Sequence, residues 1–149
     1  MPPIPRMVVV GQLNLIVRDM DAAVSFYRRL GWSIETPTPE HARAVLPNGL
    51  RVEFDTPEFA AKWDTGYHGS TGGSTLLGME TASREEVDDL YQDLQAHGGR
   101  GRQPPYDAFW GSRFAIVDDP EGNPIGLLSR IDDARRFWPP SQPPQATSA

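Results

Sequence analysis

The sequence contains no cysteine among its 149 residues. Disulfide bonds, thiolate metal ligands and a cysteine nucleophile are therefore excluded, and the composition fits a reducing compartment. The sequence also lacks a run of apolar residues long enough to cross a bilayer, and its first ten residues, MPPIPRMVVV, lack the long apolar segment of a signal peptide. We therefore expect a cytoplasmic protein with no membrane partner.

Clustered positive charge is absent as well. The 14 Lys and Arg residues are outnumbered by 20 Asp and Glu residues, which gives a formal net charge of -6. Nucleic-acid binding requires basic side chains that neutralise phosphates, and an anionic membrane surface requires a basic cluster. The sequence therefore predicts no nucleic-acid partner, and its length fits one domain with its own core.

The chain is organised as a repeat, because each half has the pattern of one strand, one helix and three further strands. The first half has expected strands at residues 7–17, 32–36, 42–46 and 50–55, and a helix with apolar residues at Ala23, Phe26, Tyr27 and Leu30. The second half has expected strands at residues 74–80, around 100–103, 112–117 and 124–129, and a helix with apolar residues at Val87, Leu90, Tyr91 and Leu94. This alternation predicts an α+β fold.

The remaining segments flank or join the two halves. Residues 1–6 form an N-terminal extension, and residues 56–73 are aromatic and rich in glycine, which favours a covering loop. Residues 131–149 are rich in Pro, Ser and Gln and are expected to be extended or partly disordered. The sequence thus predicts a single domain over residues 7–130, with one module at 7–55 and the other at 74–130.

Two stretches, NLIVRDMDAAVSFYRRLGW at residues 14–32 and WGSRFAIVDDPEGNPIGLL at residues 110–128, resemble the vicinal oxygen chelate superfamily. That superfamily includes glyoxalase I, extradiol dioxygenases and the bleomycin- and mitomycin-binding resistance proteins. The resemblance spans about residues 8–129. It implies two tandem βαβββ modules whose mixed sheets curl around a cavity, which holds a metal in some members and none in others.

Metal-dependent members place one ligand near the start of each module and one carboxylate on its last strand. The resemblance puts these positions at Gln12, Glu53, Ser74 and Gly126. Gln12 and Glu53 offer oxygen atoms, but a serine hydroxyl is a poor ligand and glycine offers none. A catalytic divalent ion needs three or more firm protein ligands, so we expect neither a metal nor another cofactor. Gly126 would instead make room for a ligand.

The three histidines do not replace the missing ligands, because no two of them have metal-ligand spacing. His41 is expected in a turn and His68 in the glycine-rich loop. His97 falls in the last turn of the second helix, where its side chain suits the free carbonyl groups, so a capping role is expected.

Three pieces look most like the mitomycin-type resistance proteins: LRVEFDTPE, STGGS and YDAFWGSRFAIVDDPEGN. Those proteins hold a planar drug between aromatic side chains in a dimer crevice. The resemblance therefore implies a homodimer that sequesters a small planar or aromatic molecule.

The aromatic residues outside the helical pattern support ligand binding, since amphipathic aromatic side chains in loops and at strand starts commonly contact ligands. They are Trp63, Tyr67, Tyr106, Phe109 and Trp110. For Trp63 and Tyr67, covering a small core is an equal alternative. Asp55 shares a strand face with Glu53 and either hydrogen-bonds the ligand or is simply solvated.

Two other functions stay open at this point. One is a metal-dependent lyase, isomerase or dioxygenase of the glyoxalase type that uses Gln12 and Glu53. The other is a structural or regulatory partner protein with an empty cavity. No catalytic residue is assigned from the sequence.

Overall fold

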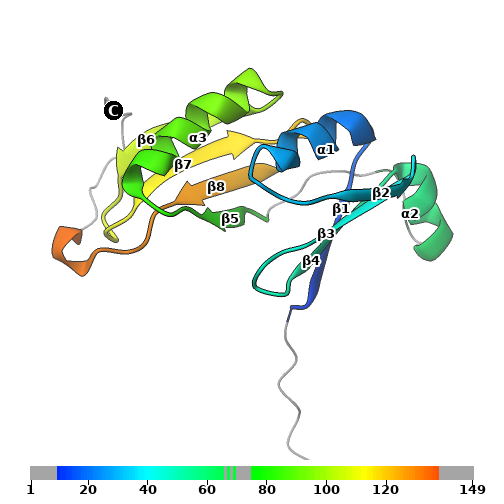
Figure 1. Cartoon of the computed structure of the whole chain (residues 1–149), viewed down its shortest axis with the longest axis horizontal. Coiled ribbons are helices and arrows are strands. Elements are labelled where there is room, and N and C mark those ends of the chain that lie inside the picture. The colour runs from blue at the N-terminus through cyan, green and yellow to red at the C-terminus, as the bar shows by residue number, and fades with distance from the viewer. Residues whose placement is uncertain (1–9, 66, 68, 70–74, 138–149) are drawn as a thin grey trace, which may run out of the picture.

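The computed structural model describes residues 10–65, 67, 69 and 75–137. The fold is α+β, as predicted, with two consecutive modules that each contribute a four-stranded mixed sheet (Figure 1). The strand orders are β1-β4-β3-β2 and β5-β8-β7-β6. In each sheet the first strand pairs in parallel with the last, and the other pairs are antiparallel.

The first module contains β1 (Gln12–Ile16), α1 (Met20–Arg28), β2 (Glu35–Thr38), β3 (His41–Val45), β4 (Arg51–Asp55) and α2 (Pro57–Trp63). The second contains β5 (Leu77–Glu80), α3 (Arg84–Ala96), β6 (Arg100–Asp107), β7 (Arg113–Asp118), β8 (Pro124–Leu128) and the short 3₁₀ helix η1 (Asp133–Arg135). Within the described part of the chain, no helix has the length and apolar character needed to cross a membrane.

Four elements differ from the sequence-based expectation. Strand β2 begins at Glu35 rather than at Trp32, and the helix η1 lies in the segment that was expected to be extended or partly disordered. The segment 56–73, expected as a loop, begins with the helix α2, because the Thr56 hydroxyl accepts a hydrogen bond from the Phe59 N–H at 3.3 Å and Pro57 suits the first turn. Strand β6 extends to Asp107, well beyond the short stretch expected around residues 100–103. Both modules otherwise have the expected element order.

The two long helices begin and end at the expected signals. The Asp19 side chain caps α1 by accepting from the Ala22 N–H, and the Ser83 hydroxyl caps α3 by accepting from the Glu86 N–H. Gly98 follows α3 with a φ of +97°. His97 donates from Nδ1 to the Asp93 carbonyl oxygen at 2.7 Å, which confirms its predicted capping role.

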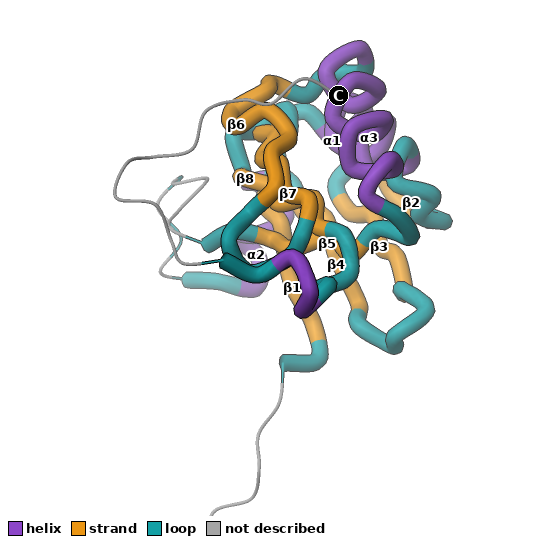
Figure 2. The backbone as a smooth tube through the Cα atoms, turned by 90° about the vertical axis from the view of Figure 1, so that its left-hand side faces the viewer, coloured by secondary structure: helices purple, strands orange, loops and turns teal. Residues whose placement is uncertain are grey.

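The two modules share one hydrophobic core. Figures 1 and 2 show α1 and α3 side by side on one side of the molecule, with the strands beneath them. The Tyr27 ring of α1 packs against Phe54 of β4, with ring centroids 5.2 Å apart. A Cβ at Gly99 would lie 2.8 Å from both Phe26 and Val117, so α1 also reaches the second sheet. The described residues therefore form one continuous packing unit.

The turn after β7 is hydrogen-bonded to the first helix. Tyr27 donates its hydroxyl hydrogen to Asp119 Oδ2 at 2.7 Å, while Glu121 Oε1 accepts from the backbone N–H groups of Arg18 and Asp19. Burial, together with the neighbouring Asp119 carboxylate, raises the pKa of Tyr27 above its ordinary value. Tyr27 is therefore a protonated donor, and the turn after β7 sits at a fixed place against α1.

Candidate functional site

The strand register makes the two modules equivalent position by position. Strands β4 and β8 have five residues each, and each follows a five-residue turn with Pro and Gly in the same places. The register in the two sheets then gives six equivalent pairs: Gln12 and Leu76, Asn14 and Gly78, His41 and Phe114, Arg43 and Ile116, Glu53 and Gly126, and Asp55 and Leu128.

These positions lie on the sheet faces that point away from the helices. Side chains alternate between the two faces of a strand, and the intervening residues Val52, Phe54, Ile125 and Leu127 belong to the core. The first-module members of the six pairs form what we call the polar face. The second-module members form the apolar face. Within these six pairs, every first-module side chain can hydrogen-bond, and its second-module equivalent is an apolar residue or glycine.

A continuous hydrogen-bond network crosses the polar face. Asp55, only 1% exposed, accepts from His41 Nδ1 at 2.7 Å and from Asn14 Nδ2 at 3.0 Å. Gln12 Nε2 donates to Asn14 Oδ1 at 2.9 Å and to Glu53 Oε2 at 3.0 Å. Asp55 is therefore a buried, bonded carboxylate, and the alternative of a solvated side chain is wrong.

His41 lies at the start of β3 rather than in the expected turn. Its ring packs against Phe59 of α2 at a centroid distance of 5.1 Å, so α2 covers this end of the polar face. The sequence carried a signal for this placement, because His41 and Arg43 alternate with the buried residues Ala42 and Ala44.

On the apolar face, the space beside Gly126 is filled by neighbouring side chains. A Cβ at Gly126 would lie 2.8 Å from Leu76 Cδ2 and 3.2 Å from the Phe114 ring. The absence of a side chain therefore accommodates Leu76 and Phe114. A ligand on this face would contact those two side chains before it reached the Gly126 backbone.

Four aromatic residues form a cluster at one end of the second sheet. Trp110 packs edge-on against Phe109 at 5.1 Å and against Phe114 at 5.2 Å, and Tyr106 packs edge-on against Phe114 at 6.1 Å. Phe109 is exposed, whereas Tyr106 and Trp110 are half-buried. The structure thus brings together three of the aromatic residues that were predicted to contact a ligand. They gather around Phe114, which the sequence analysis did not single out.

The other predicted aromatic contacts lie elsewhere. Trp63 is exposed at the end of α2, and Tyr67 is half-buried shortly after it. In Figure 1, α2 and η1 lie at opposite ends of the molecule, and the aromatic cluster is at the η1 end because the Phe137 N–H donates to the Phe109 carbonyl oxygen. Within one chain, the polar face and the aromatic cluster are therefore separate.

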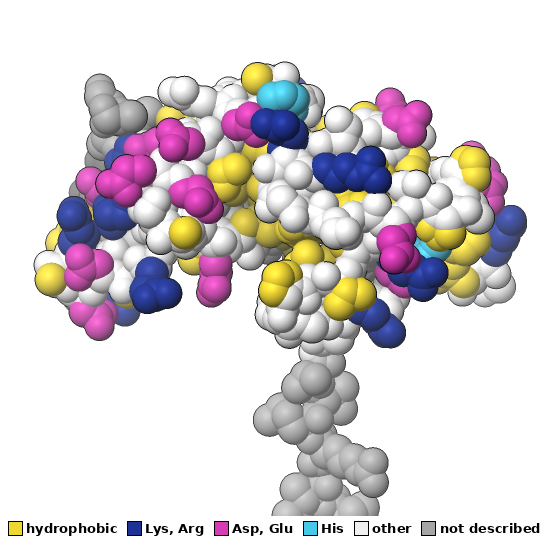
Figure 3. All heavy atoms as spheres, in the orientation of Figure 1, with side chains coloured by type: hydrophobic (Ala, Val, Ile, Leu, Met, Phe, Trp, Pro, Cys, Tyr) yellow, Lys and Arg dark blue, Asp and Glu magenta, His cyan; other side chains and the backbone are white. Residues whose placement is uncertain are grey.

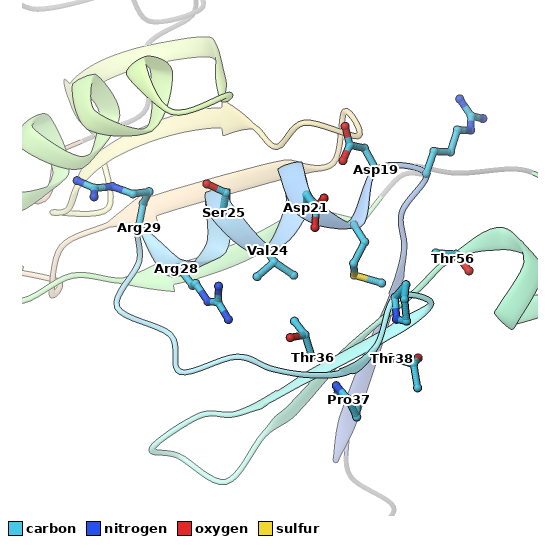
Figure 4. Close-up of a pocket in the computed structure, with 13 residues that line it drawn as sticks. Asp19, Asp21, Val24, Ser25, Arg28, Arg29, Thr36, Pro37, Thr38 and Thr56 are labelled. Atoms are coloured by element: carbon cyan, nitrogen blue, oxygen red, sulfur yellow. The ribbon is translucent and has the colours of Figure 1, made fainter.

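Two further cavities lie beside α1 and between the modules. One of about 1050 Å³ runs between α1 and β2, where Val24 lies across from Thr36 (Figure 4). Another of about 530 Å³ opens between the modules beside Trp32, Leu46, Met79 and Leu90, where apolar side chains gather in the centre of Figure 3. Neither is lined by any of the sequence-predicted site residues.

The described residues do not fit a catalytic metal. The register puts Leu76, rather than Ser74, at the position equivalent to Gln12, and Ser74 itself lies outside the described residues. Gln12 and Glu53 are hydrogen-bonded to each other, and Leu76 and Gly126 have no ligating side-chain atom. Across the described ranges, no three or more His, Asp or Glu side chains are grouped so that they could hold an ion.

Residues 9–127 match the family model described as the Glyoxalase/Bleomycin resistance protein/Dioxygenase superfamily. The chain belongs to this superfamily. The uncharacterized protein YraH of Bacillus subtilis (strain 168) is 28% identical over 127 residues, which cover 80% of this chain and 97% of that protein. The expected membership of the vicinal oxygen chelate superfamily is thereby confirmed.

Solved structures of this superfamily have the same fold. A glyoxalase-related enzyme from Fulvimarina pelagi superimposes with a TM-score of 0.76 at 24% identity, covering 83% of this chain and 89% of that one. A family enzyme from Burkholderia phytofirmans PsJN gives a TM-score of 0.72 at 21% identity, covering 82% and 98%. At these identities the likeness establishes the fold alone.

Proposed function

We propose that this superfamily member is a metal-free binding protein that sequesters a small planar or aromatic molecule, as antibiotic-resistance proteins do, and that it performs no catalysis. The observation that carries the proposal is the replacement of polar by apolar residues at equivalent positions. This replacement leaves two of the four metal-ligand positions without a ligating side chain. It also puts Leu76 and Phe114 where the first module has Gln12 and His41.

The aromatic cluster supplies the binding surface. Trp110 and Tyr106 are not fully buried, and Phe109 is exposed, so ring faces or edges remain accessible to a ligand. Stacking on a flat ring system contributes about 1–3 kcal/mol for each aromatic side chain. A planar molecule is therefore the class of ligand that this surface favours.

A homodimer would bring the polar face and the aromatic cluster together. Each sheet presents its face away from the helices, and the two faces lie toward opposite ends of one chain. In a two-fold symmetric dimer, the polar face of each copy opposes the apolar face of the other. Two equivalent crevices result, and each has one polar and one aromatic wall.

Static light scattering at micromolar concentration should accordingly give a mass about twice that of the 16.5 kDa chain. The expected mass follows from the need for a second copy to complete each crevice. A monomer mass under these conditions would contradict the proposed crevice.

Calorimetric titration with 2-methoxynaphthalene tests the binding function itself. We expect saturable binding with one site per chain, since each dimer has two crevices. If neither this probe nor its hydroxyl analogue 2-naphthol gave saturable binding, planar-ligand binding would be refuted.

A further inference from the structure

The hydrogen bonds of the polar face have a fixed direction. An ionised carboxylate can only accept, so the groups that face Glu53 and Asp55 must be donors. This assigns the amide nitrogen of Gln12 to Glu53 and the amide nitrogen of Asn14 to Asp55. It also leaves the Asn14 oxygen facing Gln12 Nε2, in agreement with their 2.9 Å contact.

Three polar atoms of Gln12, Glu53 and His41 remain free once these bonds are made. They are Gln12 Oε1, Glu53 Oε1 and His41 Nε2, none of which has a hydrogen-bond partner among the described residues. The bond from His41 Nδ1 to the Asp55 carboxylate puts a ring proton on Nδ1. Gln12 Oε1 and Glu53 Oε1 are therefore acceptors.

Three basic side chains lie on or near the polar face. Arg43 Nε lies 3.6 Å from Glu35 on the edge strand β2, and Lys62 Nζ on α2 lies 3.3 Å from Glu40. Arg51 is exposed at the start of β4. Gln12 Oε1 and Glu53 Oε1 are thus two adjacent acceptors, and Arg43 is the cross-strand neighbour of Glu53.

We infer that the ligand of the proposed crevice carries hydrogen-bond donors, as an aromatic alcohol or an aromatic amine does, on the edge that meets Gln12 and Glu53. This inference rests on the proposed function. A ligand that offered only acceptors would leave these atoms unpaired when the crevice excluded water, and unpaired buried polar groups oppose binding strongly.

Three naphthalenes of matched shape test the inference by calorimetry at pH 7. The probes are 2-naphthol, which donates, 2-methoxynaphthalene, which only accepts, and 2-naphthoate, which is an anionic acceptor. We expect 2-naphthol to bind about tenfold more tightly than 2-methoxynaphthalene, as a hydrogen bond to a charged acceptor typically allows. We expect 2-naphthoate to bind most weakly because it faces Glu53.

Glu53→Gln should remove this preference. The new amide must accept from Gln12 Nε2, so its own NH₂ group would turn toward the ligand and convert the acceptor into a donor. The affinities of 2-naphthol and 2-methoxynaphthalene should then converge to within about twofold. Glu85→Gln, which changes an exposed carboxylate on α3, away from both faces, is the matched control and should leave the tenfold preference intact.

Three results would overturn the inference while leaving planar-ligand binding in place. They are equal affinities of the wild-type protein for 2-naphthol and 2-methoxynaphthalene, a retained preference in Glu53→Gln, and tightest binding of 2-naphthoate. The last of these would show that Arg43 and Arg51 decide selectivity. If none of the three probes bound the wild-type protein, the proposed function would fail and the inference with it.

Discussion

Replacing Trp110 by alanine is expected to weaken the binding of 2-methoxynaphthalene roughly 5- to 150-fold, which corresponds to about 1–3 kcal/mol of lost stacking. Trp110 is half-buried and touches Phe109 and Phe114 edge-on, so its truncation removes ligand-contacting surface from the cluster. The protein should remain folded, because the main core lies on the opposite side of the sheet. Calorimetric affinity and thermal unfolding of the same preparation measure the two effects.

Trp32→Ala provides the matched control. Trp32 is also half-buried, but it stacks on Tyr27 at 5.0 Å and packs against the main core. Its truncation should lower the melting temperature and leave the affinity of the folded protein unchanged. The reverse assignment, in which Trp110→Ala lowers the melting temperature sharply at unchanged affinity, would make Trp110 a structural residue.

Replacing Gly111 by alanine should destabilise the protein by at least about 2 kcal/mol, since two penalties combine at this position. Gly111 has a φ of +97°, and a Cβ there would overlap the backbone carbonyl oxygen of Asp132. The Asp132 N–H also donates to the Gly111 carbonyl oxygen, which ties the segment after β8 to the aromatic loop. Relief of the overlap would displace Trp110, so ligand affinity should fall as well.

Gly122→Ala separates the two penalties. Gly122 has a similar φ of +86°, but a Cβ there would meet no atom within 4 Å. Its substitution should therefore cost only the conformational penalty, about 1 kcal/mol, with unchanged ligand affinity. Urea unfolding of both variants gives the comparison. Equal losses of stability would show that contact with Asp132 contributes nothing at Gly111.

The element order was predictable because apolar spacing and capping residues mark both modules. The helix α2 was not, since it has only seven residues and one buried residue, Ala60. A helix that short depends on its cap and on its contact with the rest of the protein, here Phe59 against His41. Thr56 and Pro57 were the local signals available.

Pairing across the sheets was beyond the sequence analysis. In the sequence, Phe114 is one of several apolar residues in an expected strand. Only the register shows that its position is equivalent to that of His41. Counting from the family pattern selected Ser74, whereas the register selects Leu76. The sequence analysis placed Gly126 on the last strand of the second module, but it could not predict which side chains pack over it.

The two family-like stretches were recognised separately, and the structure shows why they occur together. Tyr27 from the first stretch donates to Asp119 from the second, across 92 positions of sequence. Asp119 also accepts from the backbone N–H groups of Glu121 and Asn123, which shapes the turn. The sequence pattern therefore reflects how one module is fastened to the other, and it carries information about fold more than about chemistry.

The metal content of the purified protein tests the central claim most directly. Protein prepared without chelators would be incubated in turn with Zn²⁺, Ni²⁺, Mn²⁺ and Fe²⁺, desalted and measured by mass spectrometry of the elements. With only Gln12 and Glu53 left to offer oxygen ligands, and those bonded to each other, the account predicts clearly substoichiometric metal in every case. One tightly held ion per chain or per dimer would contradict it and would favour a metal-dependent lyase, isomerase or dioxygenase.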